Sequence, residues 1–210
     1  MKHIVLLGDS IFDNAAYVGG GLDVTTHLRN RTPPDWEVTL KAVDGSIVQD
    51  VHKQTYDLPP QATHLILSIG GNDALRKAGI LEARAQSAAE VLDWLASAGE
   101  EFQDNYHRML LAVLAKNIPT AICTIYYPRF PEQRIQRLAS TALTVFNDVI
   151  IREAFMAGVP LLDLRLICDR DEDYANPIEP SEEGGGKIAA AIVGLLGGHM
   201  FERCRTEVFV

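Results

Sequence analysis

The chain has 210 residues, enough to bury one substantial hydrophobic core, and one domain is the default at this length. Hydrophobic residues make up 47% of the chain and charged residues 22%. This composition excludes a disordered protein and a small disulfide-rich protein. The net charge of -9 and the absence of a Lys/Arg cluster argue against a nucleic-acid partner, because such binding depends on basic surfaces.

The cysteines predict a reducing environment. Cys123, Cys168 and Cys204 are odd in number and far apart, with neither a Cys-x-x-Cys pair nor the spacing of zinc ligands. We therefore expect reduced thiols, no metal site and a cytoplasmic location. The first apolar run, residues 4–7, is too short for a signal peptide, and no apolar stretch approaches the ~18 residues of a membrane span.

Short apolar runs alternate with helical patterns along the chain. Buried strands are predicted where such runs are bounded by Gly, Pro, Asp or Asn, at residues 3–7, 38–43, 65–69, 120–125 and 159–162. Helices are predicted from just after Ser10, at residues 47–53, at residues 81–117 with a break near Gly99, at residues 132–157 and at residues 182–196.

This alternation predicts an α/β protein, a three-layer α/β/α sandwich around a parallel sheet of about five strands. We assign residues 1–198 to this single domain. The C-terminal tail, residues 199–210, has three open interpretations: an added edge strand, a partner contact or a disordered end. Parallel sheets bind ligands beyond the carboxyl ends of their strands, and the loops there carry Ser10, Gly45 and Asn72.

Each of these three residues has a structural and a functional interpretation. Ser10 and Asn72 are each either a helix N-cap or a reactive group, and Gly45 is either a simple turn or a backbone amide aimed into a pocket. The combination favours chemistry, because consecutive parallel strands bring a hydroxyl nucleophile and two hydrogen-bond donors to one sheet edge. Acyl transfer needs that set of groups, a nucleophile and an oxyanion hole.

Four segments resemble the first, second, third and fifth blocks of the SGNH or GDSL hydrolases. They are Gly-Asp-Ser at residues 8–10, Gly45, Gly-Gly-Asn-Asp at residues 70–73 and Pro-Ser-Glu-Glu-Gly at residues 180–184. The resemblance implies a flavodoxin-like fold and an esterase, thioesterase, lipase or carbohydrate deacetylase activity. It also implies Ser10 as nucleophile, with the amides of Ser10 and Gly45 and the side chain of Asn72 as the oxyanion hole.

The last block departs from the family pattern. Where the family has Asp-x-x-His-Pro-Ser, with the His as base, residues 176–181 read Asn-Pro-Ile-Glu-Pro-Ser. Glu179 stands at the position of the base and Asn176 at that of the orienting Asp. A desolvated Glu179 would gain a pKa near the working pH and serve as the base; the other interpretation is weak or absent hydrolysis. None of the histidines falls in this block: His3, His27, His52, His64, His107 and His199.

The sequence therefore predicts a serine hydrolase of small carboxylic esters or thioesters that works without metal or organic cofactor. The acids at positions 169, 171 and 173 lack the glycine and the glutamate of a calcium loop. Residues 126–128, Tyr-Tyr-Pro, with Phe12, Tyr17 and Leu75, are candidates to line an acyl or sugar pocket, or simply to pack. The competing functions are a catalytically inactive, hydrolase-like binding protein and, less well supported, a flavodoxin-like regulatory module. The oligomeric state stays open.

Overall fold

The computed structural model describes residues 1–210 apart from the side chain of Arg203. Its main sheet has six strands in the order β2-β1-β3-β4-β5-β8, and neighbouring strands are parallel. The strands are β1 (His3–Gly8), β2 (Glu37–Leu40), β3 (His64–Ser68), β4 (Thr120–Cys123), β5 (Leu161–Leu162) and β8 (Val208–Phe209). A small antiparallel pair consists of β6 (Tyr174–Asn176) and β7 (Glu179–Pro180).

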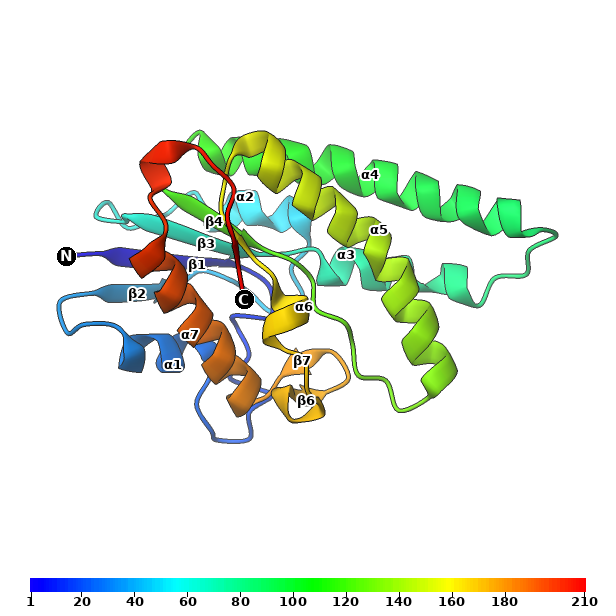
Figure 1. Ribbon diagram of the computed structural model, residues 1–210, viewed down its shortest axis with the longest axis horizontal. Coiled ribbons are helices and arrows are strands. Elements are labelled where there is room, and N and C mark those ends of the chain that lie inside the picture. Colours follow the sequence, from blue (N-terminus) through cyan, green and yellow to red (C-terminus); the bar gives the residue numbers. More distant parts are fainter.

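Helices cover both faces of the sheet (Figure 1), which confirms the predicted three-layer α/β/α sandwich. On one face α1 (Val24–Arg31) packs against α7 (Glu182–Gly198); on the other α4 (Ala88–Leu114) packs against α5 (Gln133–Ala157). The shorter helices are α2 (Val51–Gln54), α3 (Gly71–Arg76), α6 (Leu164–Ile167) and the 3-10 turns η1 (Val48–Asp50), η2 (Ala78–Leu81), η3 (Asp171–Asp173) and η4 (Phe201–Arg203). Within the described part of the chain, no helix combines the length and apolar character needed to cross a membrane.

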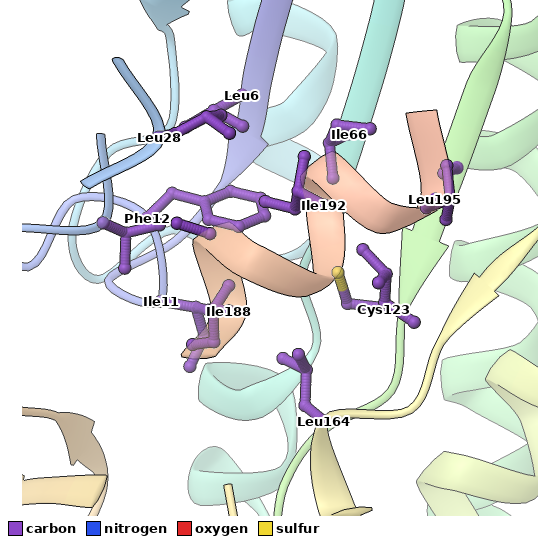
Figure 2. Packing of buried hydrophobic residues seen from close by; sticks show 14 of the residues in the cluster. Leu6, Ile11, Phe12, Leu28, Ile66, Cys123, Leu164, Ile188, Ile192 and Leu195 are labelled. Carbon is purple, nitrogen blue, oxygen red and sulfur yellow. The ribbon is translucent and has the colours of Figure 1, made fainter. Parts of the chain in front are cut away.

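Successive residues of the inner strands β1, β3, β4 and β5 enter different cores, because the side chains of a strand point alternately to the two faces of the sheet. In β1, Ile4 and Leu6 join the core on the side of α1 and α7, whereas Val5 and Leu7 join the core on the side of α4 and α5. Figure 2 shows the first core, to which α7 contributes Ile192. Burial on both faces explains why the strands are continuous apolar runs.

The helix predicted directly after Ser10 is wrong. Residues 10–23 form turns and irregular backbone, and α1 begins at Val24, where Asp23 is the N-cap and accepts a hydrogen bond from the amide of Thr26. The chain after Ser10 turns because the Asp9 carbonyl accepts the amide of Phe12. Because no helix begins at Ser10, the interpretation of Ser10 as a helix N-cap is also wrong.

The break predicted near Gly99 is also wrong, since α4 continues through this residue and the interruption lies at residues 82–87, before the N-cap Ser87. A Cβ atom on Gly99 would lie 2.6 Å from Cγ1 of Val145 on α5. The glycine therefore allows close packing of two helices, and that contact outweighs the usual destabilisation of a helix interior by glycine.

The C-terminal tail, residues 199–210, forms an edge strand, one of its three open interpretations. Its strand β8 pairs in parallel with β5. The main sheet therefore has six strands, one more than the five runs that the sequence predicts. One side-chain bond ties the tail to α5, since the Thr206 hydroxyl donates to the Ala154 carbonyl at 2.8 Å. Within the tail, His199 Nε2 lies 3.0 Å from the Arg205 carbonyl oxygen.

Candidate active site

The carboxyl edge of the sheet carries a cavity of about 220 Å³ that is lined by Ser10, Asn72 and Glu179, among others. Ser10 follows β1, Asn72 follows β3, and Glu179 begins β7, just before α7. The fourth predicted site residue, Gly45, lies on the exposed turn after β2 and is not part of the cavity wall. The fold thus brings together three residues that are far apart in the sequence.

Ser10 and Glu179 form a direct hydrogen bond, in which the Ser10 hydroxyl donates to Oε1 of Glu179 at 3.1 Å. Both residues are buried, with 7% and 6% of their surfaces exposed. Oε2 of Glu179 is also buried and has no hydrogen-bond partner among the described residues. Burial raises the pKa of Glu179 to about 7, although the bond from Ser10 lowers it in part. At neutral pH this carboxyl is therefore divided between its proton-accepting and proton-donating forms.

Three other residues hold the Glu179 segment in place. Oδ1 of Asn176 accepts the backbone amides of Ile178 and Glu179 at 3.0 and 3.1 Å. The Tyr126 hydroxyl donates to the Ile178 carbonyl at 2.7 Å, and Nδ2 of Asn14 donates to the Pro180 carbonyl at 3.2 Å. Asn176 therefore positions the backbone that leads into Glu179, and Asn14 holds the backbone that follows it.

Sequence reasoning did not find Asn14, and it assigned Tyr126 to the pocket wall without a hydrogen-bonding role. Asn14 is fully buried and its Oδ1 also accepts the amide of Val24 at 3.0 Å, so it connects the start of α1 to the Glu179 segment. In the sequence it is one polar residue in a loop. Its burial depends on distant parts of the chain, so the sequence carries no local signal for it.

Asn72 lies in the first turn of α3, whose N-cap is Gly70, so the N-cap interpretation of Asn72 is wrong. Its Nδ2 donates to the backbone carbonyl of Ser46 at 2.9 Å. This bond ties the loop after β2 to the start of α3 and leaves the second amide proton of Asn72 uncommitted in that contact. Gly45, the residue before Ser46, has a φ of 77°, in the left-handed region that favours glycine.

Gly8 allows the end of β1, just before Ser10, to lie very close to the end of β3. A Cβ atom on Gly8 would lie 1.7 Å from the carbonyl oxygen of Ser68 at the end of β3, and its φ is 128°. The side chain of Gln54 bonds to both the amide and the carbonyl of Gly8, each at 2.8 Å. Only glycine permits this close approach of the two strand ends, and Gln54 satisfies the backbone groups that the approach leaves buried.

Asp9 is a second buried carboxyl in the cavity wall, to which sequence reasoning assigned no separate role. Its Oδ1 accepts the amide of Ile11 at 3.2 Å. Burial raises the pKa of Asp9 to about 8, and the nearby charges of Glu179 and Asp73 add to the effect. Asp9 is therefore mostly neutral at pH 7, which avoids a second negative charge beside the site.

The rest of the cavity wall is mainly apolar and comes from α3, η2, α4 and α5. Among the candidate pocket residues, Tyr126, Pro128 and Leu75 line the cavity, whereas Tyr127 does not. Phe12 does not, because it packs in the core beside α1 and α7. Tyr17 does not line it either; its hydroxyl donates to Oδ2 of Asp44 at 2.7 Å.

The fold is a three-layer α/β/α sandwich with a cavity at the carboxyl edge of its parallel sheet, where proteins of this class bind their ligands. Residues 6–185 match the model of the GDSL-like Lipase/Acylhydrolase family. Because this match covers most of the chain, the protein belongs to that family, whose members are esterases, lipases and acylhydrolases that act on ester bonds. The family predicted from the sequence is thus confirmed.

Solved structures with similar folds include three hydrolases of low sequence identity. A lipase from Streptomyces rimosus has a TM-score of 0.66 and 14% identity, over 95% of this chain and 100% of the lipase. A phospholipase A1 from Streptomyces albidoflavus has a TM-score of 0.65 and 18% identity, over 92% of this chain and 98% of the phospholipase. A lipase/acylhydrolase from Enterococcus faecalis has a TM-score of 0.65 and 18% identity, over 94% of this chain and 96% of the acylhydrolase. These structures support the fold, and no curated protein matches the sequence.

Proposed function

We propose that this protein hydrolyses carboxylic esters or thioesters through an acyl-enzyme at Ser10. The observation that carries the proposal is the 3.1 Å hydrogen bond from the Ser10 hydroxyl to Glu179 inside the cavity. Nucleophile and base must be within hydrogen-bond reach before any proton can transfer. The pKa of about 7 for Glu179 gives the carboxylate the basicity that the transfer needs.

In the first half-reaction, Ser10 Oγ attacks the ester carbonyl carbon while Glu179 takes the hydroxyl proton. The negative charge that develops on the carbonyl oxygen is stabilised by the amide of Ser10 and by the free amide proton of Asn72. Gly45, whose turn does not border the cavity, donates no hydrogen bond in this step. A neutral Asp9 adds no repulsion to this charge. The protonated Glu179 then donates to the leaving oxygen or sulfur, and the acyl group stays on Ser10.

In the second half-reaction, water enters where the alcohol or thiol has left. Glu179 takes a proton from this water, which attacks the acyl-enzyme carbonyl, and the same oxyanion donors act again. Collapse of the intermediate releases the carboxylic acid. Glu179 returns its proton to Ser10 Oγ, which restores the starting state without a metal or an organic cofactor.

Glu179 takes the place of the family histidine in this proposal. No histidine lines the cavity in the part of the chain that the structure describes. An exposed glutamate with its ordinary pKa of 4.5 would be a weak base at pH 7, and burial corrects this deficit. A carboxylate has no tautomer to select, so Asn176 is sufficient as a residue that positions the backbone.

The experiment compares the wild type with Ser10→Ala on short p-nitrophenyl esters and on an acyl thioester. We expect Ser10→Ala to lower kcat/KM by about 1,000-fold or more, because loss of a nucleophile removes the covalent route. Ser97→Ala, an exposed position on α4, is the matched control and should keep the wild-type rate. A fluorophosphonate should add its mass to Ser10 of the wild type only.

Two results would reject the proposal. If the wild type turns over no faster than Ser10→Ala across the panel, the cavity belongs to a catalytically inactive binding protein. If the fluorophosphonate modifies another residue, and Ser10→Ala keeps the wild-type rate, the nucleophile is not Ser10.

A further inference from the structure

We propose that the cavity beside Ser10 is an acyl channel that selects esters of unbranched acids of about eight carbons. This inference rests on the proposed function and adds the substrate class. The acyl channel is the apolar part of the cavity, between α3, η2, α4 and α5. Its walls include Leu75, Ile80, Leu81, Leu95, Ala142 and Leu143.

The first argument is the helical spacing of the channel wall. On α5 the lining residues are Ile135, Ala139, Ala142, Leu143 and Phe146, a spacing that places them on one helix face. Only Phe146 at the inner end is fully buried. In a packed protein such a stripe contacts another apolar surface, whereas here it borders the open volume that leads to Ser10.

The second argument is the position of the polar groups. Ser10, Asn72 and Glu179 lie at the reacting end of the cavity, whereas the walls supplied by α4 and α5 are apolar. Two further charged residues border the cavity. The Lys77 ammonium pairs with Glu101 at 2.6 Å, and Glu82 is exposed to solvent. The channel therefore suits an alkyl chain and offers little to a sugar or a charged acyl group, whose polar atoms would lose their hydrogen bonds to water.

The third argument is size. The whole cavity has a volume of about 220 Å³, so its apolar part holds at most roughly seven groups of about 30 Å³, the share of one water molecule in the liquid and similar to one methylene. Seven carbons beyond the carbonyl carbon make an octanoyl group. Shorter chains leave part of the apolar wall exposed to water, and much longer chains exceed the channel.

The chemistry assigns the channel to the acid side of the ester. The acyl group stays attached to Ser10 after the first half-reaction, so it can remain in the channel throughout the cycle. The alcohol must leave before water reaches Glu179, which requires an open path on the other side. A leaving group buried between α4 and α5 would obstruct that exchange.

The test measures kcat/KM for p-nitrophenyl esters from acetyl to dodecanoyl. We expect an increase of about threefold per added methylene, because burial of each methylene is favourable, a maximum near octanoyl and a fall at dodecanoyl. A parallel series of acetate esters with methyl to octyl alcohols should change by less than threefold. A flat acyl series, or a chain-length preference only in the alcohol series, would overturn the inference.

Matched variants locate the effect in the channel. Ala142→Phe should lower the ratio of octanoyl to acetyl kcat/KM by about tenfold or more, because the ring occupies the volume that the octanoyl chain would fill. Thr141→Phe adds a ring at the adjacent, exposed position and should leave the ratio unchanged. Leu143→Ala lengthens the channel and should move the optimum toward decanoyl, which tests the inference even if Ala142→Phe does not fold. Unchanged ratios in both channel variants would overturn it.

A binding experiment separates the two proposals. In Ser10→Ala, methyl octanoate should raise Tm by several degrees and methyl acetate should not, because only the longer ester fills the channel. If the wild type proves inactive while methyl octanoate still stabilises Ser10→Ala, the channel stands and the hydrolase proposal fails. If the wild type hydrolyses acetyl esters but methyl octanoate has no effect on Tm, the channel inference fails alone.

Discussion

The two halves of α5 share one helical periodicity and yet differ in what their apolar faces contact. The C-terminal half, which includes Ile150 and Ala154, is buried in the core beside the sheet. The N-terminal half, which includes Ala139 and Leu143, borders the cavity. Phe146 lies at the boundary, with its ring centroid 5.0 Å from that of Phe102 on α4. One helix thus stabilises the fold with one half and shapes the site with the other.

The same division applies to the polar groups. Far from the cavity, Oε2 of the buried Glu153 is paired with Nδ1 of His107 at 2.8 Å. At the cavity, Oε2 of Glu179 has no partner among the described residues, and Asp9 is held with a raised pKa. Buried carboxyls without compensation are destabilising and cluster where chemistry needs them. The comparison predicts that changes at the cavity alter activity more than stability, and that changes in the packed half do the reverse.

The largest expected effect is on catalysis. Glu179→Gln should lower kcat/KM by about 100-fold or more at pH 8, because an amide cannot take the Ser10 proton. In the wild type, kcat/KM should fall about tenfold per unit below pH 7, since the base must be deprotonated and its pKa is about 7. Glu183→Gln, an exposed acid on α7, is the control. A wild-type rate and pH profile in Glu179→Gln would show that another group is the base.

A pair of truncations on α5 tests the division directly. Ile150→Ala should lower the free energy of unfolding by about 2 to 5 kcal/mol, since it leaves a cavity in the packed core. Leu143→Ala should lower the free energy of unfolding by less than about 1 kcal/mol, because Leu143 borders the cavity instead of packing in the core. Urea unfolding measures both. Equal losses would mean that the two halves of α5 are packed alike.

The smallest expected effect is a gain in stability. Folding raises the pKa of Glu179 from 4.5 to about 7, so above pH 4.5 the folded protein binds more protons than the unfolded chain and stability falls as the pH rises to about 7. Glu179→Gln removes this loss and should raise the free energy of unfolding by about 1 to 3 kcal/mol at pH 8. At pH 4 the gain should vanish. A loss of stability at pH 8 would contradict the assigned cost of the buried carboxylate.

Much of this site was predictable from the chain because it depends on strand order. Ser10 and Asn72 each follow a buried apolar run, and parallel strands end at the same edge of a sheet. Glu179 was identified by its place in a family pattern. The helix expected after Ser10 and the break expected at Gly99 were wrong, because the Asp9 turn and the contact with Val145 depend on tertiary packing that local propensity does not include.

Local patterning in the sequence was sufficient for the α/β/α class, the central strands and the candidate nucleophile, because hydrophobic periodicity and turn residues act over a few positions. Tertiary structure alone decided the burial of Glu179 and Asp9, the bonds from Asn14 and Tyr126, and the apolar cavity. Each of these depends on how segments more than fifty residues apart exclude water from one another, and desolvation of that kind leaves no local pattern in the chain.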